Sequence, residues 1–552
     1  MRLPAKISTL LLCCASLSRS AFGVSCQVAA PHVPQPAEMA FLRADYDVAV
    51  NLYSEALTQK PGDPGLTAGL VEVLLHQQKV AEANNVVTKA LSANSKSAVL
   101  QTALGFVQFR AGTPWLAADS AARATSLDPC YARARLLNVR ILRLNSLYKS
   151  AADELKTAHS LDPYDPAIRG AWIQTLPLEE RIKAAEDFLN SSNGADAEEQ
   201  KRLRLYLDDL KKLASQSGKS CRLASTESTT ELPFARIMLD GAHVRAYGLD
   251  VKLNNHNARL EVDTGAGGVL ISRSVAKQAG LEEFSATEVG GIGVGGEKPA
   301  YTAYVDTIKI GSLEFHDCAV TVFDSRDVVG VDGLIGMNVF SNFLVTLDYP
   351  MRRIILGPLP PRPHDAASVK PSLATNADEN SAVENSGSDG KQATPAHGAA
   401  IEPQDRYIAP EMADWTKVYR VGHQLLIPAA LNQSVLKLFI LDTGAFSTTV
   451  SPEAAREVTK VHSNYDMTVR GLSGKVNKVY STGEMTFDFA NLRQPASGVV
   501  AFDMSAISKH TGLEVSGFIG ITTLGQLRVK IDYRDALVKF DYDPRRGYRS
   551  LY

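Results

Sequence analysis

The pattern of hydrophobic and polar positions changes once along this chain of 552 residues. Up to about residue 215 the apolar residues follow a helical period, which predicts amphipathic α-helices. From Leu232 onward they alternate in short runs interrupted by Gly and Asn, which predicts β-strands. A stretch rich in Ser, Thr and Gly at 217–230 separates the two parts and is interpreted as a linker. The chain is therefore expected to be multidomain, with a helical part followed by a mainly β part.

The helical part repeats itself at intervals of 34 residues. Two columns of alanines recur at this interval, and a third column of proline or serine follows the second. The columns are Ala49, Ala83, Ala117 and Ala151, then Ala56, Ala90, Ala124 and Ala158, then Pro61, Ser95, Pro129 and Pro163. Small residues seven apart share a helix face and let a neighbouring helix approach, and proline ends a helix. We predict stacked helix pairs over 37–215, with a polar capping helix at 196–215.

This arrangement resembles the tetratricopeptide repeat, an α-solenoid built from helix pairs. The resemblance is carried by the period and by the alanine columns. Tyr53 and Leu155 fill the bulky position between the alanines, whereas Ala121 underfills it. The resemblance implies a concave groove that takes a peptide or another protein as partner, and no residue identifies that partner. The alternative is an alanine-rich helical array that only stacks.

The β part contains one arrangement of residues twice. An apolar strand ends on Asp-Thr-Gly-Ala and a second apolar run follows, at 260–271 and again at 439–450. Further on, Gly-Leu-Ile-Gly at 333–336 corresponds to Gly-Phe-Ile-Gly at 517–520, and Asp-Tyr follows at the same distance in both copies. Such an order is hard to obtain by chance, so we predict two duplicated β lobes.

The predicted lobes cover 232–357 and 407–552. Between them, 358–406 is rich in Pro, Ala, Ser, Asn and Gly and has almost no large apolar residues. This composition predicts a disordered linker. A linker of this length lets the two lobes pair within one chain, and pairing between two chains is the alternative.

The doubled motif resembles the aspartic peptidases. It is closer to the retropepsin branch, because Ala266 and Ala445 follow the two Asp-Thr-Gly turns. The resemblance implies two β lobes about a pseudo-two-fold axis, with Asp263 and Asp442 meeting at their interface as the catalytic residues. It also implies that each acid turn is supported by its threonine and glycine, the threonines through reciprocal hydroxyl bonds. These supporting residues are Thr264, Gly265, Thr443 and Gly444.

Glycine-rich hairpins close over the substrate in this family, and the resemblance implies one in each lobe. They are expected at 290–296 and 471–474, where plain hairpin turns are the alternative. The candidate flap residues are Gly291, Gly293, Gly295, Gly471 and Gly474.

Two adjacent carboxyl groups can hydrolyse an amide without a cofactor or a metal. They cannot both ionise easily, so they share one proton. The ionised acid takes a proton from water while the protonated acid donates to the carbonyl, and the roles then reverse. We therefore expect an aspartic endopeptidase that acts on polypeptides, and the near symmetry leaves open which acid begins as base. The alternative is a non-catalytic protein-binding scaffold with a degenerate peptidase fold, which Gly267 and Gly268 after the first turn would suit.

Charge and the N-terminus set the expected location. The chain has 58 basic and 60 acidic residues, so no basic excess points to nucleic acid as a partner. Residues 1–23 combine a basic start, an apolar run at 7–17 and small residues at Ala21 and Gly23, which predicts a signal peptide. The alternative is an uncleaved membrane anchor, although the run is shorter than the roughly 20 residues that a spanning helix needs. We expect an exported protein, periplasmic or secreted, with no membrane span once the signal is removed.

Four cysteines lie beyond the predicted signal: Cys26, Cys130, Cys221 and Cys318. An exported protein can form disulfides, but four cysteines allow three complete pairings and the spacing selects none. The spacing also fits no zinc motif. Between disulfides and isolated buried thiols, we favour the thiols.

Overall fold

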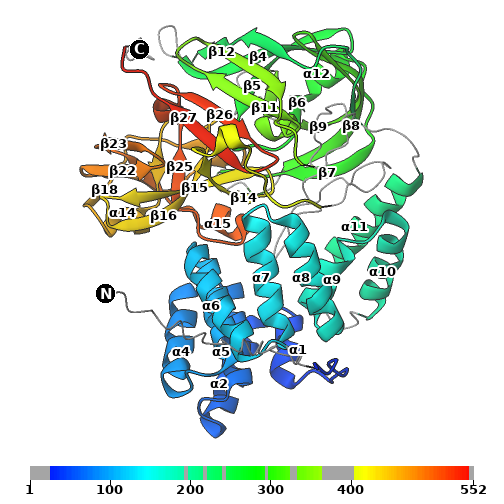
Figure 1. Cartoon of the computed structure of the whole chain (residues 1–552), viewed down its shortest axis with the longest axis vertical. Coiled ribbons are helices and arrows are strands. Elements are labelled where there is room, and N and C mark those ends of the chain that lie inside the picture. Colours follow the sequence, from blue (N-terminus) through cyan, green and yellow to red (C-terminus); the bar gives the residue numbers. More distant parts are fainter. Residues whose placement is uncertain are drawn as a thin grey trace, which may run out of the picture.

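The computed structural model describes residues 25–191, 197–215, 221–238, 244–292, 296, 298–323, 332–363 and 403–545. The predicted signal peptide at 1–23 and the part of the predicted linker at 364–402 lie outside the described residues. Helices form one end of the molecule and two β lobes form the other (Figure 1).

The helical end is built from consecutive helix pairs. Their bounds are α1 Pro36–Leu42, α2 Tyr46–Gln59, α3 Pro64–His76, α4 Val80–Ala93, α5 Ala98–Arg110, α6 Pro114–Leu127, α7 Ala132–Leu144, α8 Tyr148–Leu161, α9 Pro166–Ile173, α10 Leu178–Ser191 and α11 Ala197–Ser215. Ala49, Ala83, Ala117 and Ala151 are at most 1% exposed, because each lies where its helix meets a neighbour. The predicted α-solenoid is confirmed. No helix in the described ranges is long and apolar enough to cross a lipid bilayer.

The first lobe is a β-sheet that begins earlier than the sequence suggested. Its elements are β1 Arg222–Leu223, β2 Thr230–Pro233, β3 Ala235–Met238, β4 Val244–Leu253, β5 His256–Asp263, β6 Val269–Ser272, α12 Arg273–Gln278, β7 Ser285–Val289, β8 Lys298–Ile310, β9 Leu313–Phe323, β10 Gly333–Gly336, η1 Met337–Phe340, β11 Phe343–Asp348 and β12 Arg353–Pro358. Its strand order is β1-β9-β6-β10-β5-β4-β8-β7. β1 lies in the stretch interpreted as a linker, yet it pairs with β9.

The second lobe repeats the central topology of the first. Its elements are η2 Pro410–Met412, β13 Thr416–Lys417, β14 Tyr419–Val421, β15 Gln424–Leu431, β16 Val435–Leu441, β17 Thr449–Val450, α14 Pro452–Arg456, β18 Val461–Ser463, β19 Arg470–Gly471, β20 Gly474–Lys475, β21 Val479–Thr482, β22 Met485–Phe489, β23 Leu492–Ala496, β24 Val500–Phe502, α15 Ser505–Thr511, β25 Gly517–Ile519, α16 Ile521–Leu524, β26 Arg528–Asp532 and β27 Leu537–Asp541. β16 lies between antiparallel β15 and parallel β25, as β5 lies between β4 and β10.

A third sheet joins the two lobes in the order β13-β27-β26-β11-β12-β2. β11 of the first lobe pairs antiparallel with β26 of the second, with Leu344 opposite Asp532 and Asp348 opposite Arg528. An Arg528 guanidinium nitrogen lies 3.0 Å from a carboxylate oxygen of Asp348. The two lobes therefore pair within one chain, a point that the sequence left open.

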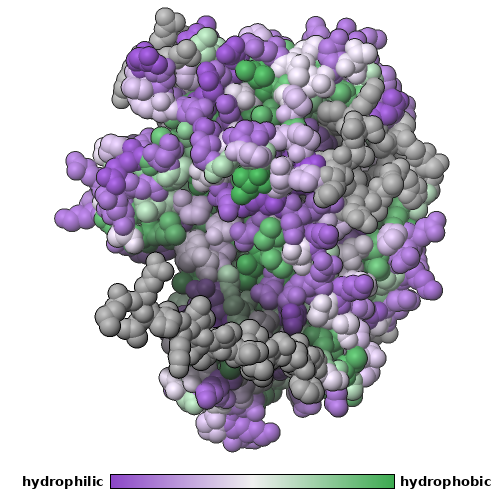
Figure 2. Space-filling model, viewed as in Figure 1, coloured by the Kyte–Doolittle hydropathy of each residue, from purple (hydrophilic) through white to green (hydrophobic). Residues whose placement is uncertain are grey.

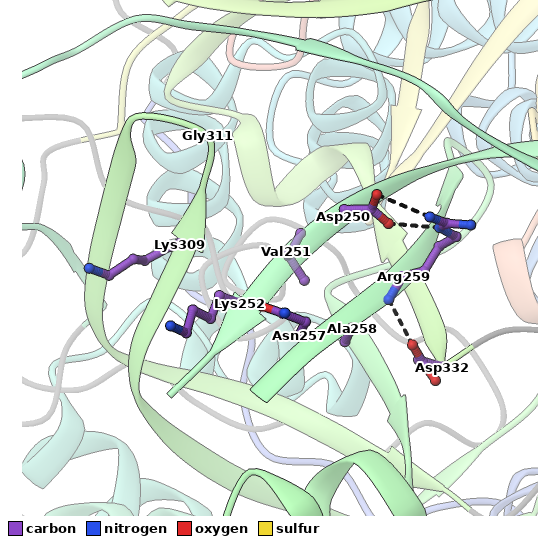
Figure 3. A pocket seen from close by; sticks show the side chains of 9 residues that line it. All are labelled: Asp250, Val251, Lys252, Asn257, Ala258, Arg259, Lys309, Gly311 and Asp332. Atoms are coloured by element: carbon purple, nitrogen blue, oxygen red, sulfur yellow. Dashed lines mark hydrogen bonds and ion pairs between the residues drawn. The ribbon is translucent and has the colours of Figure 1, made fainter. Parts of the chain in front are cut away.

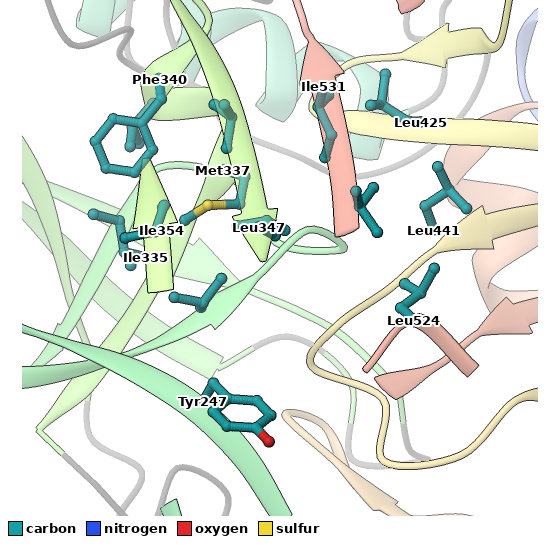
Figure 4. Packing of buried hydrophobic residues seen from close by; sticks show 14 of the residues in the cluster. Tyr247, Ile335, Met337, Phe340, Leu347, Ile354, Leu425, Leu441, Leu524 and Ile531 are labelled. Atoms are coloured by element: carbon teal, nitrogen blue, oxygen red, sulfur yellow. The ribbon is translucent and has the colours of Figure 1, made fainter. Parts of the chain in front are cut away.

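One hydrophobic core contains residues of both lobes (Figure 4). Leu347 on β11 and Ile354 on β12 belong to it from the first lobe, and Ile531 on β26 and Leu441 on β16 from the second. Each of these side chains is at most 2% exposed. Because burial of apolar surface is the main favourable term in folding, separating the lobes would carry a large cost.

The solenoid packs against the second lobe. Phe109 of α5 and Leu137 of α7 belong to the same buried apolar cluster as Leu438 and Ile440 of β16. The outer face of β16 is apolar. Residues of α5 and α7 belong to the cluster that buries this face. Figure 2 shows that the visible surface carries only scattered hydrophobic patches among hydrophilic residues.

Hydrogen bonds add to this contact. The Glu514 amide, just before β25, donates to the Arg110 carbonyl of α5 at 2.9 Å. On α8, the Ser150 hydroxyl donates to an Asp405 carboxylate oxygen at 2.6 Å. Asp405 stands where the chain leaves the predicted linker, so the start of the second lobe is also held against the solenoid.

The cysteines form two disulfides, Cys26–Cys130 and Cys221–Cys318. Our expectation of isolated buried thiols is therefore wrong. The first bond ties the segment before α1 to the turn before α7, and the second ties the start of β1 to β9. The partners are 104 and 97 residues apart in the sequence, so only the folded chain brings them together.

Candidate active site

The first acid is presented at the end of β5. β10 runs parallel beside this strand and places Gly336 next to Asp263. A Cβ atom on Gly336 would lie 2.2 Å from the Ala266 carbonyl oxygen, so only glycine allows the two segments to lie this close. The Gly336 amide donates to the Gly268 carbonyl at 2.8 Å, and the Gly268 amide donates to Asn338 Oδ1 at 3.1 Å. The first acid turn is thus held from one side by its own lobe.

The second acid is presented in the same way after β16. The Asp442 amide donates to the Ile519 carbonyl of β25 at 3.0 Å. A Cβ atom on Gly520 would lie 2.5 Å from the Ser447 carbonyl oxygen. The Gly520 amide donates to Thr448 Oγ1 at 3.2 Å. Both lobes therefore use a glycine after an apolar pair of residues to bring a strand close to the acid turn.

Two threonines bind the turns to each other across the lobe interface. The Thr264 hydroxyl donates to the Leu441 carbonyl at 2.7 Å and accepts from the Thr443 amide at 3.0 Å. The Thr443 hydroxyl donates to the Val262 carbonyl at 2.9 Å and accepts from the Thr264 amide at 3.1 Å. Each hydroxyl is thus used twice, and both threonines are 2% exposed. The two turns form one rigid unit.

Each carboxyl group lies against the glycine of the opposite turn. A Cβ atom on Gly265 would stand 2.6 Å from Asp442 Cγ, and one on Gly444 would stand 2.5 Å from Asp263 Cγ. The two acids are also joined by a side-chain hydrogen bond. The structure therefore brings together all six residues that the sequence assigned to the two acid turns.

Burial and mutual proximity change the acidity of this pair. Burial raises the pKa of Asp263, and burial together with the charge of Asp263 raises the pKa of Asp442 well above its usual range. Amide donors oppose the shift, since Gly265 donates to Asp263 Oδ1 at 2.8 Å and Gly444 to Asp442 Oδ1 at 2.9 Å. This arrangement favours a single proton held between the two acids.

The two candidate flap segments touch each other. The Gly291 amide donates to the Ser473 hydroxyl at 3.0 Å, and the Ser473 amide donates to the Ile292 carbonyl at 3.0 Å. A Cβ atom on Gly471 would lie 2.4 Å from the Ile292 carbonyl oxygen. The first-lobe segment and the β19–β20 hairpin therefore each donate one of these hydrogen bonds to the other.

Of the remaining candidate flap glycines, the structure describes only one. Gly474 has φ of 100°, a left-handed conformation that glycine adopts without strain in a tight turn. Gly293 and Gly295 lie outside the described residues. Leu472, at the tip of the β19–β20 hairpin, packs against the same small apolar cluster as Ala266 of the first acid turn. The hairpin of one lobe thus lies close to the acid turn of the other.

His423 is a residue at this site that sequence reasoning missed. It lies in the turn between β14 and β15, and its Nε2 is 3.1 Å from the Gly265 carbonyl oxygen. A carbonyl only accepts, so Nε2 carries the hydrogen. Burial, followed by the nearby His510, lowers the pKa of His423 to about 4, so the ring is neutral at neutral pH. No sequence signal pairs His423 with Gly265, because the two residues belong to different lobes.

A buried ion pair distinguishes the first acid from the second. Glu261 stands two residues before Asp263 on the same face of β5, is 4% exposed, and binds Arg245 at 2.6 Å. Burial raises the pKa of Glu261 to about 7, Arg245 opposes this, and Asp263 adds to it. The matching residue of the second lobe is Ile440, which is apolar. The pseudo-symmetry of the dyad is therefore broken next to Asp263.

A charged hollow of about 690 Å³ lies elsewhere on the first lobe (Figure 3). Arg259 binds both carboxylate oxygens of Asp250, at 2.7 and 3.1 Å, and its amide donates to Asp332 at 2.8 Å. Lys252 and Lys309 complete the charged lining. Neither Asp263 nor Asp442 lines this hollow. The charges of Arg259 and Asp250 already neutralise each other.

Family models match two parts of the chain. Residues 249–339, which include the first acid turn, match the model described as aspartyl protease. Residues 40–105 match the model described as tetratricopeptide repeat. The two matches agree with the two resemblances that the motifs carried.

Curated relatives match over a short region. The DNA damage-inducible protein 1 of Neurospora crassa is 29% identical over 110 residues, which are 20% of this chain and 24% of that protein. The UBA domain-containing protein Mud1 of Schizosaccharomyces pombe is 30% identical over 102 residues, which are 18% of this chain and 30% of that protein. The chain therefore spans less than a third of the length of these relatives.

Solved structures are similar to the separate parts. A thermophilic TPR protein of Thermus thermophilus is 21% identical with a TM-score of 0.26, over 32% of this chain and 94% of that one. A retropepsin-like aspartic protease of Rickettsia conorii is 20% identical with a TM-score of 0.19, over 24% of this chain and 94% of that one. The family assignment rests on the motifs and the family models: this chain combines tetratricopeptide repeats with a retropepsin-like aspartyl protease domain.

Proposed function

We propose that this protein is an aspartic endopeptidase that cleaves polypeptides with Asp263 and Asp442. The observation that carries the proposal is the packing of each carboxyl group against the glycine of the opposite turn, with a hydrogen bond between the acids. Two carboxyl groups in this arrangement share one proton, as the reaction requires.

The reaction follows from this shared proton. The ionised acid takes a proton from a water molecule, which attacks the amide carbonyl, while the protonated acid donates to the carbonyl oxygen. When the tetrahedral intermediate collapses, a proton passes to the leaving nitrogen and the two roles exchange. The threonine bonds keep the acids in place during these transfers, because both hydroxyls are fully used.

The flaps give the substrate its path. Gly291 and Ser473 hold the two flap segments together, so a polypeptide enters after these bonds open. Closure over the bound chain then excludes bulk water and leaves the attacking water molecule with the acids, which strengthens the electrostatic interactions of the reaction.

The solenoid recruits polypeptide in this proposal. Tetratricopeptide-type solenoids present an extended concave surface to other proteins. Here α5 and α7 pack against the second lobe, so a polypeptide held on the solenoid is held near the catalytic domain. The solenoid then acts as a fixed part of the enzyme and not as a loosely tethered arm.

The test is cleavage of an unfolded protein by the purified chain. Asp263→Asn and Asp442→Asn should each lower kcat by at least about 10³-fold, since each removes one partner of the proton exchange. Asp250→Asn is the matched control, because Asp250 is an acid of the same sheet that does not touch the dyad. Full turnover in either dyad variant would refute the mechanism. A native chain that neither cleaves nor binds a transition-state-mimicking peptide would favour the scaffold function.

We also propose that the protein is exported, to the periplasm or the medium. The predicted signal peptide motivates this, and the two disulfides support it, because such bonds persist in oxidising compartments. N-terminal sequencing of the protein recovered from its source should begin at Val24. Recovery of the chain with Met1 intact in the cytosolic fraction would contradict export.

A further inference from the structure

The tip of the second-lobe hairpin places an apolar side chain on the first lobe. Leu472, between β19 and β20, packs in a small apolar cluster whose other members all belong to the first lobe. We call these other members the first-lobe apolar surface: Ala266, Leu270, Val289, Ala300, Phe323 and Leu334. Four of them are at most 6% exposed, whereas Leu472 itself is half-buried. Leu472 therefore covers this surface from the outside.

The first-lobe apolar surface borders the first acid turn. Ala266 belongs to it, and the Ala266 amide donates to Asp263 Oδ1 at 3.1 Å. Leu334 lies on β10, two residues before the Gly336 that stands next to Asp263. A substrate residue beside the bond to be cleaved has to reach the same place, because the acid acts on that bond. Leu472 thus lies where a substrate side chain is expected.

The second lobe shows the matching contact. Ile292 of the first-lobe flap segment and Ala445 of the second acid turn pack against one apolar cluster. By strand register, two buried members of that cluster correspond to Phe323 and Leu334 of the first lobe, namely Phe502 and Phe518. The contact is therefore reciprocal: each flap segment places an aliphatic side chain in the apolar cluster that includes the acid turn of the other lobe.

The hairpin that carries Leu472 is separate from the larger sheets. Within the described residues, β19 and β20 pair only with each other. A two-stranded hairpin alone is marginally stable in water, so the contacts of its tip are important. The tip contacts the first lobe through Leu472 and through the two hydrogen bonds of Ser473. Leu472 can therefore leave the first lobe without disrupting a larger sheet.

We propose that Leu472 occupies, in the free chain, the site that takes an aliphatic side chain of the polypeptide substrate beside the scissile bond. The second-lobe hairpin then blocks the first acid turn until a substrate side chain replaces Leu472. The leucine of the hairpin indicates the size and the apolar character of the side chain that the site accepts. The assignment of this surface as a substrate site rests on the proposed function.

Binding is measured on the full chain by isothermal titration calorimetry with two peptides that cannot be cleaved. Both carry a reduced amide in place of the scissile bond, and one has leucine on each side of it where the other has glycine. Leu472→Ala should bind the leucine peptide about tenfold more tightly than the native chain does, because the peptide no longer competes with Leu472 for the same surface. The affinity for the glycine peptide should be nearly unchanged, since glycine leaves Leu472 in place.

Two variants serve as controls. Leu472→Met keeps an apolar side chain of similar volume and should bind both peptides as the native chain does. Leu436→Ala shortens a leucine of β16 that is 42% exposed and lies outside the cluster, so it should also leave binding unchanged.

Hydrogen exchange followed by mass spectrometry gives a readout that needs no peptide. The Ser473 amide donates to the Ile292 carbonyl, so it is protected while the hairpin is closed. Its exchange should be faster in Leu472→Ala than in the native chain and in Leu472→Met. Unchanged exchange would show that Leu472 does not hold the hairpin closed, and would contradict the proposal.

Three binding results would overturn the proposal. Weaker binding of the leucine peptide by Leu472→Ala would make Leu472 a permanent wall of the substrate site. Equal gains for the two peptides would show that the alanine variant only loosens the hairpin. Absence of binding to the native chain and to Leu472→Ala would leave no substrate site for Leu472 to block.

The outcome is separable from that of the proposed function. A native chain that binds the leucine peptide in the expected pattern and cleaves nothing would contradict only the peptidase function. A native chain that cleaves, together with a Leu472→Ala variant that binds the leucine peptide less tightly, would contradict only the blocking role of Leu472.

Discussion

Gly444 lies so close to Asp263 that a Cβ atom on the glycine would stand 2.5 Å from the Cγ of the acid. The same relationship joins Gly265 to Asp442 at 2.6 Å. The glycine of each Asp-Thr-Gly turn therefore leaves the space that the carboxyl group of the other lobe occupies. The position of each of the two carboxyl groups depends on the whole lobe interface.

Gly444→Ala should therefore damage catalysis more than folding. The added methyl group forces the Asp263 carboxyl to move, and a misplacement on the order of 1 Å costs about 100-fold in rate. We expect kcat to fall by about that factor while the melting temperature changes little. Gly357→Ala, where a Cβ atom meets nothing within 4 Å, is the control and should keep full activity.

Thr264→Val should destabilise the interface between the lobes. Valine has nearly the same shape, but it leaves the Leu441 carbonyl and the Thr443 amide without their buried partner. Each unsatisfied group costs about 1–3 kcal/mol, so the free energy of unfolding measured in urea should fall by about 2–6 kcal/mol. Thr264→Ser keeps the hydroxyl and should recover most of it. A valine variant as stable as the native chain would show that the hydroxyl is dispensable.

The activity of the dyad should peak nearer neutral pH than that of pepsin-like enzymes. Burial raises the pKa of both Asp263 and Asp442, and the Ala266 and Ala445 side chains offer no hydroxyl to stabilise the ionised acids. The shared proton is consequently retained to higher pH. A profile of kcat/KM against pH checks this, and a maximum well below pH 4 would contradict it.

Glu261 should make the chain less stable as the pH rises. Its pKa is about 7 in the folded state and lies near 4.5 in its ordinary state, so the folded state holds the proton more tightly. The associated stability is present below about pH 4.5 and is lost as the pH rises through about 7. Glu261→Gln should flatten this part of the curve of melting temperature against pH. An unchanged slope would show that Glu261 does not titrate in this range.

His423 should act as a positioning residue for the first acid turn. His423→Ala removes the donor to the Gly265 carbonyl, so we expect a lower kcat with KM nearly unchanged, and His423→Gln should recover part of the loss. Because its folded pKa is depressed to about 4, the native chain loses stability as the pH falls from about 6.5 to 4. The alanine variant should lose less stability over this range. Equal kcat in all three proteins would leave His423 with a structural role only.

The repeat units and the acid turns were readable from the sequence because they depend on local patterns. The alanine columns occur where close helix packing needs small residues, and the four alanines of the first column, Ala49, Ala83, Ala117 and Ala151, are at most 1% exposed. Likewise, each apolar strand that ends on Asp-Thr-Gly carries its own glycine turn. The fold class and the retropepsin-like and tetratricopeptide resemblances followed from these patterns.

The tertiary structure alone decided which distant segments meet. Leu438 and Ile440 of β16 are apolar, and only the folded chain shows that helices α5 and α7 share the cluster that buries them. The pairing of Cys26 with Cys130, and of His423 with the Gly265 carbonyl, likewise joins residues that are more than 100 positions apart. A hydrophobic period tells which face of an element avoids water. It does not tell which partner covers that face, because that choice depends on the packing of the whole chain.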